Sequence, residues 1–122
     1  MLIRKLIEEN VLEAKSGKYY AGDVLFSAGE SPEFVYFFIT GSATLTSRSG
    51  EELQLLVPGS FAGLTDILNE RYTCSACANA PSEILKIRRQ KLLDLIERNP
   101  ALRVYFLKLM SKGLSRARPL YE

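Results

Sequence analysis

Glycines recur at short intervals through the first half of this chain, and they limit its fold more than any other feature. Six of the eight glycines lie between residues 22 and 63. Short runs of aromatic and β-branched residues separate them, as at 24–26 and 34–40. Glycine tolerates the backbone conformations that tight corners require, so this spacing is typical of a compact antiparallel sheet. The pattern favours a roll or barrel over a helical bundle.

The apolar patterns predict where the elements of this fold lie. Alternating or apolar runs predict strands over 19–20, 24–26, 34–40, 42–47, 52–57, 73–78 and 83–88, with a hairpin turn at 48–51. Apolar residues spaced three and four apart predict helices over 2–13, 89–98 and 101–117, and one helical turn over 64–68. The segment 34–39 is apolar on both faces, which is typical of a central strand covered on each side.

The length and composition fit one domain with one core. The chain has 122 residues, of which 47% are hydrophobic and 25% charged. No repeat or linker divides it, so we expect a single domain over 1–122, with the roll over about 15–88 and C-terminal helices over about 89–117. No apolar run reaches the ~18 residues of a membrane span, and the first residues are unlike a signal peptide. We therefore expect a cytoplasmic protein with no membrane partner.

The reactive side chains argue against catalysis. The chain has no histidine and two cysteines, Cys74 and Cys77, so a single-chain zinc site would lack half its usual ligands. A metal-dependent enzyme on a cupin-like roll and a Ser-His or Cys-His nucleophile are disfavoured for the same reason. The two thiols are interpreted as small core side chains, with a redox pair as the alternative. We expect no enzyme activity, no metal and no cofactor.

Charge is distributed unevenly along the chain. Residues 86–122 hold 10 basic and 3 acidic side chains, although the whole chain carries a formal net charge of only +2. A basic helix attracts nucleic acid or an acidic partner surface. The simpler interpretation is a solvated helix face that complements an acidic roll.

The last predicted helix carries more apolar residues than one contact surface can cover. Val104 and Leu107 are apolar but lie off the main stripe, so the helix needs a second partner. We expect homodimerisation through this helix, with packing against two surfaces of the same chain as the alternative. The predicted dimer helix comprises Leu102, Tyr105, Phe106, Leu109, Met110, Gly113, where close approach is permitted, and Leu114.

Several segments, in their order and spacing, together resemble a known family. They are Tyr20-Ala21-Gly22-Asp23-Val24-Leu25-Phe26, Ala28-Gly29-Glu30, the run from Val35 to Ala43, the run from Pro58 to Gly63, and Ala78 followed by Ser82 to Ile87. The chain resembles the cyclic nucleotide-binding domain of the catabolite activator protein and protein kinase A regulatory subunit superfamily. The resemblance implies a mainly β fold, an antiparallel eight-stranded β-roll (a double-stranded, jelly-roll-like β-helix) with a short N-terminal helix and C-terminal helices.

The resemblance also implies a phosphate-binding cassette over 59–73, in which this chain departs from the family. Gly63 matches the family's glycine, but Leu64 stands where a glutamate binds the ribose. Tyr72 stands where an arginine binds the phosphate, and Thr73 takes the adjacent hydroxyl position. Arg71 is one residue out of register, and a shifted loop that brings it into the pocket is the alternative. The remaining polar candidates for ligand binding are Thr65 and Asp66.

The missing contacts decide the predicted function. Hydrogen bonds to charged groups contribute about 1.5 to 3 kcal/mol each, so losing two weakens binding by roughly 3 to 6 kcal/mol.

We expect a non-enzymatic sensor module with weak or no binding of cyclic AMP or cyclic GMP, an unidentified small ligand, and signalling through the C-terminal helices. The alternative is a ligand-free dimerisation or protein-interaction scaffold. Direct DNA binding is not expected, because no recognition helix follows the long helix. The downstream partner, and whether the chain is a fragment of a larger regulator, stay open.

Overall fold

The computed structural model describes residues 2–9 and 12–117, with no account of side chains over 2–4 and 110–117. One short helix precedes eight strands, and two helices follow them. The elements in chain order are α1 (Leu2–Glu8), β1 (Lys15–Tyr19), β2 (Val24–Phe26), β3 (Phe34–Thr40), β4 (Ala43–Thr46), β5 (Glu52–Leu56), β6 (Phe61–Ala62), the 3-10 turn η1 (Leu64–Asp66), β7 (Ser75–Ala78), β8 (Ser82–Arg88), α2 (Arg89–Arg98) and α3 (Pro100–Ala117).

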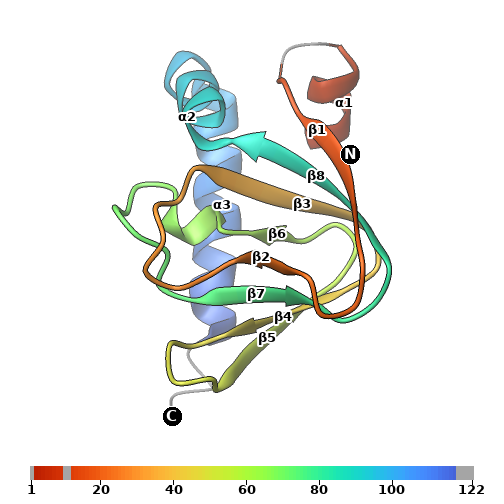
Figure 1. The fold of residues 1–122 in the computed structure, drawn as a ribbon. Helices are drawn as coiled ribbons and strands as arrows, with labels where there is room; N and C mark the ends of the chain where they lie inside the picture. The colour runs from red at the N-terminus through yellow and green to blue at the C-terminus, as the bar shows by residue number, and fades with distance from the viewer. Residues whose placement is uncertain (1, 10–11, 118–122) are drawn as a thin grey trace.

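The strands form two antiparallel sheets that face one another as a roll (Figure 1). The first sheet has the order β1-β8-β3-β6, and the second has the order β2-β7-β4-β5. The helix α3 runs behind the roll from α2 toward the opposite end of the molecule (Figure 1). The predicted mainly β roll with a short N-terminal helix and C-terminal helices is confirmed.

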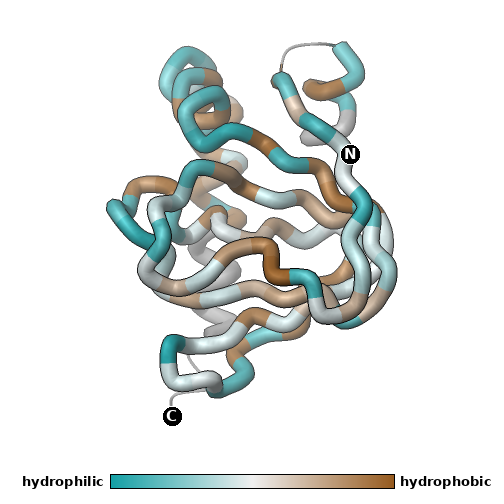
Figure 2. Tube along the Cα trace, in the orientation of Figure 1, coloured by the Kyte–Doolittle hydropathy of each residue, from teal (hydrophilic) through white to brown (hydrophobic). Residues whose placement is uncertain are grey.

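Two clusters of buried residues make the core, one on each face of the first sheet. The inner cluster fills the roll and includes Phe26, Tyr36, Phe38 and Ile84. The outer cluster lies between the first sheet and the helices, and its strand residues are those that alternate with the inner ones, such as Phe37 and Ile87. Hydrophobic and hydrophilic residues alternate over the last four residues of β8, Leu85 to Arg88 (Figure 2). The strand β3 is buried on both faces, as its sequence predicted.

A corner glycine shows why the spacing of glycines marks this fold. Gly41 joins β3 to β4 with a φ of +86°, a backbone conformation that residues other than glycine rarely adopt. A β-carbon at Gly41 would also overlap the side chain and backbone of Ser82. The Ser82 hydroxyl in turn accepts a hydrogen bond from the Ser42 amide at 3.2 Å. The corner therefore needs glycine both for its conformation and for its packing.

Two predicted elements have other bounds in the structure, and one strand was not predicted. The helix expected over 2–13 ends at Glu8, and beyond it the Leu12 amide donates to the Leu6 carbonyl at 3.0 Å while Leu12 itself is buried; residues 10–11 lie outside the described part. The first strand covers Lys15–Tyr19 and not 19–20, because a half-exposed edge strand needs no apolar alternation. The two-residue strand β6 was not predicted, since so short a segment has no periodicity.

Candidate functional site

The cassette segment begins at a constrained glycine. Gly63 has a φ of +84° and precedes η1. A β-carbon at this position would lie 3.2 Å from Cε1 of Tyr72 and 3.3 Å from the carbonyl oxygen of Phe34. The backbone therefore approaches these two residues closely, in the space where the family resemblance places a ligand.

Tyr72 occupies that space with its own ring. The side chain is 4% exposed, and its ring stacks on Phe26 with the centroids 4.0 Å apart. Its hydroxyl donates to the carbonyl oxygen of Phe34. Phe26 stacks in turn against Tyr36, whose hydroxyl donates to the carbonyl of Leu25 at 3.1 Å. Burial raises the pKa of Tyr72 to about 12, so the hydroxyl stays protonated and donating at neutral pH.

Asp66 is the buried charge of the cassette. It is 1% exposed, and its carboxylate accepts hydrogen bonds from the Thr73 amide at 3.0 Å and from the Thr73 hydroxyl at 3.0 Å. The Asn69 side-chain amide donates to the same carboxylate at 2.7 Å. A buried carboxylate is tolerated only where such donors surround it. Asp66 therefore closes the cassette loop by holding both donors of Thr73.

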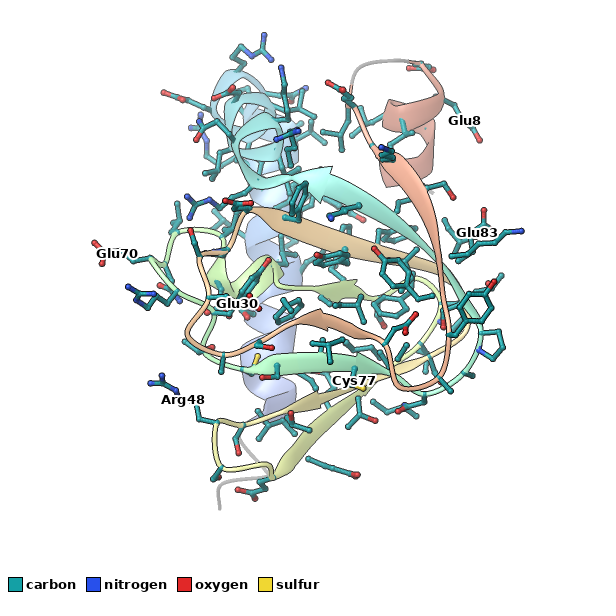
Figure 3. The ribbon with its side chains drawn as sticks, in the orientation of Figure 1. Glu8, Glu30, Arg48, Glu70, Cys77 and Glu83 are labelled. Carbon is teal, nitrogen blue, oxygen red and sulfur yellow. The ribbon has the colours of Figure 1, made fainter. Side chains whose placement is uncertain are left out.

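Arg71 turns away from the interior of the roll. Its guanidinium is exposed and donates from Nη1 to the Gly29 carbonyl at 2.7 Å. Backbone hydrogen bonds pair the same two loops, from the Gly29 amide to the Tyr72 carbonyl and from the Tyr72 amide to the Glu30 carbonyl, each 2.8 Å long. Glu70, beside Arg71, projects outward from the tip of the cassette loop (Figure 3). The shifted register that would bring Arg71 into the pocket is not the one in this structure.

Leu64 faces the helices and not the interior of the roll. It is 6% exposed and belongs with Ile67 to the outer cluster, and η1 contacts α3. Thr65, between Leu64 and Asp66, is exposed. The residues predicted as one binding set are thus divided among three environments: Tyr72 lies inside the roll, Leu64 lies against the helices, and Thr65 and Arg71 face solvent.

The predicted dimer helix is divided in a similar way. Leu102 and Phe106 are 3% and 2% exposed in the outer cluster, so the protomer itself buries them. Their assignment to a contact with a second chain does not fit this burial. Tyr105 and Leu109 are partly buried against the same cluster, and the side chains of Met110, Gly113 and Leu114 lie outside the described part. Among the side chains of α3 that the structure describes, the large apolar ones that are exposed are Val104 and Leu107, at 51% and 56%.

The two cysteines lie in different surroundings. Cys74 is buried in the inner cluster and Cys77 is half-buried on β7, and both are free thiols. Burial raises the pKa of the Cys74 thiol, and the nearby Asp66 carboxylate raises it further. A thiol held protonated is a poor nucleophile, so Cys74 behaves as a core side chain.

The structure also assigns roles that sequence reasoning missed. Phe26 and Tyr36 form the aromatic stack that receives Tyr72, and Asn69 is a donor to Asp66. The only sequence signal for the stack was the presence of aromatic residues on successive strands.

No helix in the described part of the chain is long and apolar enough to cross a membrane.

Comparison with known proteins places this cassette in context. The family described as the cyclic nucleotide-binding domain matches residues 17–99. The chain is 31% identical to the cAMP-activated global transcriptional regulator CRP of Pasteurella multocida (strain Pm70), over 80% of this chain and 49% of that protein. The chain therefore spans about half the length of this curated relative.

Solved structures share the fold at lower identity. FixK2 from Bradyrhizobium japonicum superposes with a TM-score of 0.80 at 18% identity, over 88% of this chain and 56% of that chain. A transcriptional regulator from Thermotoga maritima superposes with a TM-score of 0.77 at 22% identity, over 94% of this chain and 91% of that chain. At this level of identity the likeness establishes the fold alone.

Proposed function

Because this chain belongs to the cyclic nucleotide-binding domain family, we propose that it is a regulatory module whose cassette does not take a cyclic nucleotide. A curated relative is a transcriptional regulator, which supports a regulatory and non-enzymatic role. The observation that carries the proposal is the carboxylate of Asp66, which accepts both the amide and the hydroxyl of Thr73.

Charge explains why that hydrogen bonding argues against a cyclic nucleotide. The family resemblance makes Thr73 a donor to the ligand's phosphate, and a phosphate entering the cassette would compete with Asp66 for the same donors. The two anions would also repel one another, because both would lie within hydrogen-bonding distance of the exposed Thr73. In this structure the Arg71 guanidinium donates to the Gly29 carbonyl instead of to the cassette. The cassette is in this sense already occupied by an anion of its own.

Shape supports the same conclusion. The Tyr72 ring lies against Phe26 at 4.0 Å, and its hydroxyl is bonded to Phe34, so a ligand would have to break both contacts to enter. Burying an aromatic side chain is worth several kcal/mol. A small ligand of another class, able to replace the Tyr72 ring, is compatible with this arrangement.

The route for a signal runs through the outer cluster. Leu64 and Ile67 of the cassette pack in this cluster together with Leu102 and Phe106 of α3. A change in the cassette that moves η1 must therefore repack against α3, because close-packed interiors transmit displacement. We propose that the module signals through its C-terminal helices in this way.

A cytoplasmic location remains a prediction of the sequence.

Calorimetric titration of the 122-residue chain with cyclic AMP and cyclic GMP tests the proposal. We expect dissociation constants of about 1 mM or weaker, since the arginine and glutamate contacts are absent. A dissociation constant of about 10 µM or tighter would contradict the proposal.

A variant pair makes the titration specific to the cassette. Tyr72→Arg empties the aromatic position and supplies a guanidinium, so cyclic AMP affinity should rise about tenfold or more over the natural chain. Tyr20→Arg is the matched control, because Tyr20 is 62% exposed and the substitution adds the same charge outside the roll. Equal gains in the two variants would show that charge alone, and not the cassette, governs binding.

A second candidate function is a dimerisation scaffold, favoured by the exposed apolar residues on α3. Val104 and Leu107 lie three positions apart, so they share one face of the helix, and each is more than half exposed. We propose that this face contacts a second copy of the chain. Sedimentation velocity should give a dimer for the natural chain and a monomer for Val104→Asp/Leu107→Asp, with Leu68→Asp, on an exposed loop residue, as the control. A monomeric natural chain at high concentration would exclude this contact.

A further inference from the structure

Three cations point to the inner face of the first sheet, which elsewhere in the roll is apolar. Lys86 and Arg88 alternate along β8 with Ile87, which belongs to the outer cluster, so they lie on the inner face. Lys86 is in register with Tyr36, a member of the inner cluster, and with Lys15 on β1. Residues in register on neighbouring strands share a face, so all three cations are on the side of the sheet that forms the roll.

These cations line a cleft at the end of the roll where β1, β8 and α2 meet. The cleft has a volume of about 500 Å³, and its fourth cation, Lys91, comes from the first turn of α2. Among its described lining residues Glu13 is the one carboxylate. We call this feature the cation cleft, defined by Lys15, Lys86, Arg88, Lys91 and Phe34. In Figure 1, β1 and α2 flank β8 at this end of the molecule.

The cation cleft carries four cations against one lining carboxylate, Glu13. Two further carboxylates, Glu30 and Glu33, line a smaller hollow that adjoins the cleft at Lys86. Lys15 and Lys86 are directly opposite one another, and like charges in that position destabilise a sheet. The Phe34 ring offers partial compensation, with Lys86 Nζ 4.0 Å and Arg88 Cζ 5.7 Å from its centre. One aromatic face cannot neutralise four cations. An anion placed among them would relieve the repulsion and gain charge-assisted hydrogen bonds.

We propose that the cation cleft binds a small polyanion of the phosphate class, such as an oligophosphate or a nucleoside polyphosphate. A cleft of this volume lies in the range of small-molecule sites. Nucleic acid contacts instead need cations spread along an extended surface that follows the phosphate backbone. The mixture of lysines with one arginine around an aromatic ring suits several phosphoryl oxygens and does not select one planar carboxylate.

The position of the cation cleft couples it to the cassette. Lys86 and Phe34 also line a smaller hollow of about 180 Å³ that includes Tyr36 and Tyr72. The carbonyl of Phe34 accepts the hydroxyl of Tyr72, and the Phe34 ring lies beneath Lys86. A ligand drawn to Lys86 would therefore act on the residue that holds Tyr72 in place. The cation cleft adjoins the hollow at Tyr72 through Lys86 and Phe34, and its proposed ligand goes beyond the proposed function.

Titration with sodium tripolyphosphate at low ionic strength tests the proposal, with calorimetry and thermal shift as the two readouts. We expect one ion bound per chain with a dissociation constant below about 1 mM. Lys86→Gln and Arg88→Gln should each weaken binding about tenfold. Inorganic phosphate should bind more weakly than tripolyphosphate, because it reaches fewer of the four cations. Raising the salt concentration should weaken all of these interactions.

A matched variant separates a built site from general attraction. Lys18→Gln removes the same charge from the strand that carries Lys15, and both lysines are exposed, but Lys18 does not line the cation cleft. It should leave the affinity within about twofold of the natural chain, since one remote, screened charge has little effect. The absence of binding, an equal loss in Lys18→Gln, or tighter binding of a short single-stranded oligonucleotide than of tripolyphosphate would each overturn the proposal. Circular dichroism spectra matching the natural chain establish that the glutamine variants are folded.

Discussion

The cassette and the cation cleft are two charged regions of one roll, and they differ in whether their charges are compensated by neighbouring groups. In the cassette, the buried carboxylate of Asp66 is surrounded by donors from Thr73 and Asn69. In the cation cleft, Lys15 on β1 faces Lys86 on β8, and Arg88 lies two residues after Lys86 on β8. The first region satisfies its charge from within the chain, and the second gathers four cations around one carboxylate, Glu13.

This difference separates what holds the fold together from what can bind. A buried, internally satisfied group contributes to stability and is costly to disturb. An exposed group of like charges contributes little or slightly opposes folding, but it attracts a counterion. We therefore expect substitutions in the cassette to change the free energy of unfolding strongly. Substitutions in the cation cleft should change affinity for anions and leave stability nearly unaltered.

The largest expected effect is the loss of the Tyr72 ring. Tyr72→Ala should lower the free energy of unfolding by about 3 to 5 kcal/mol, because it leaves a cavity beside Phe26 and removes a hydrogen bond to Phe34. Urea denaturation followed by circular dichroism measures this change. Tyr20→Ala, at an exposed position, should cost less than about 0.5 kcal/mol. Similar costs in the two variants would mean that Tyr72 does not fill the roll.

Removing the buried carboxylate should have the next largest effect. Asp66→Ala leaves the amide and hydroxyl of Thr73 without their acceptor, so the free energy of unfolding should fall by about 2 to 4 kcal/mol. Inorganic phosphate should then raise the melting temperature of the variant more than that of the natural chain, because an external anion can take the vacated donors.

The control for this experiment is another carboxylate that accepts a side-chain hydrogen bond. Asp94 on α2 accepts from the Gln90 side chain at 3.0 Å, within one exposed helix face. Asp94→Ala should cost about 0.5 kcal/mol or less and should show no added response to phosphate. An Asp66→Ala variant that unfolds no more easily than Asp94→Ala would remove the basis for an internally occupied cassette.

The hydroxyl of Tyr72 predicts how stability depends on alkaline pH. Burial raises its pKa to about 12, whereas the unfolded chain loses this proton near pH 10. Because the folded state holds this proton to higher pH, the contribution of the Tyr72 hydroxyl to stability is constant below about pH 10 and is lost as pH rises toward about 12. Burial also raises the pKa of Tyr36, and the loss due to that residue is common to the natural chain and the Tyr72 variant. Tyr72→Phe should cost about 1 kcal/mol at pH 7 through the lost hydrogen bond to Phe34.

The same variant should show a shallower loss of melting temperature between about pH 10 and 12 than the natural chain does. Tyr20→Phe serves as the control at an exposed tyrosine. Identical alkaline profiles for Tyr72→Phe and the natural chain would show that Tyr72 is not the residue responsible.

The sequence was sufficient for the fold and the family, but not for the geometry of the predicted cassette. Glycine corners and strand patterns predicted the roll because they depend on local conformation and on alternation. The direction in which Leu64 points depends on where α3 packs, which is a long-range property with no local signal. The carboxylate of Asp66 meets Thr73 seven residues away through an irregular loop, and no periodic pattern predicts such a loop.

The cation cleft was hidden for a related reason. The excess of basic residues after residue 86 was visible in the sequence and was assigned to the last helices. The cleft instead takes Lys86 and Arg88 from β8 and joins them to Lys15, about seventy residues earlier in the chain, through strand register. Register between strands so far apart depends on the completed sheet, so a one-dimensional charge count cannot place these residues together.

The smallest expected effect compares two lysines on the same strand. Lys15 faces Lys86 across the β1–β8 pair, whereas Lys18 faces Glu83 in the same pair. Lys15→Met should therefore raise the free energy of unfolding by a few tenths of a kcal/mol at low salt, and Lys18→Met should lower it by about as much. Both changes should vanish at about 1 M salt, where screening acts within ~3 Å. Thermal unfolding at the two salt concentrations measures the difference. A destabilised Lys15→Met chain would mean that the cations of the cleft are already neutralised, which would remove the contrast with Asp66.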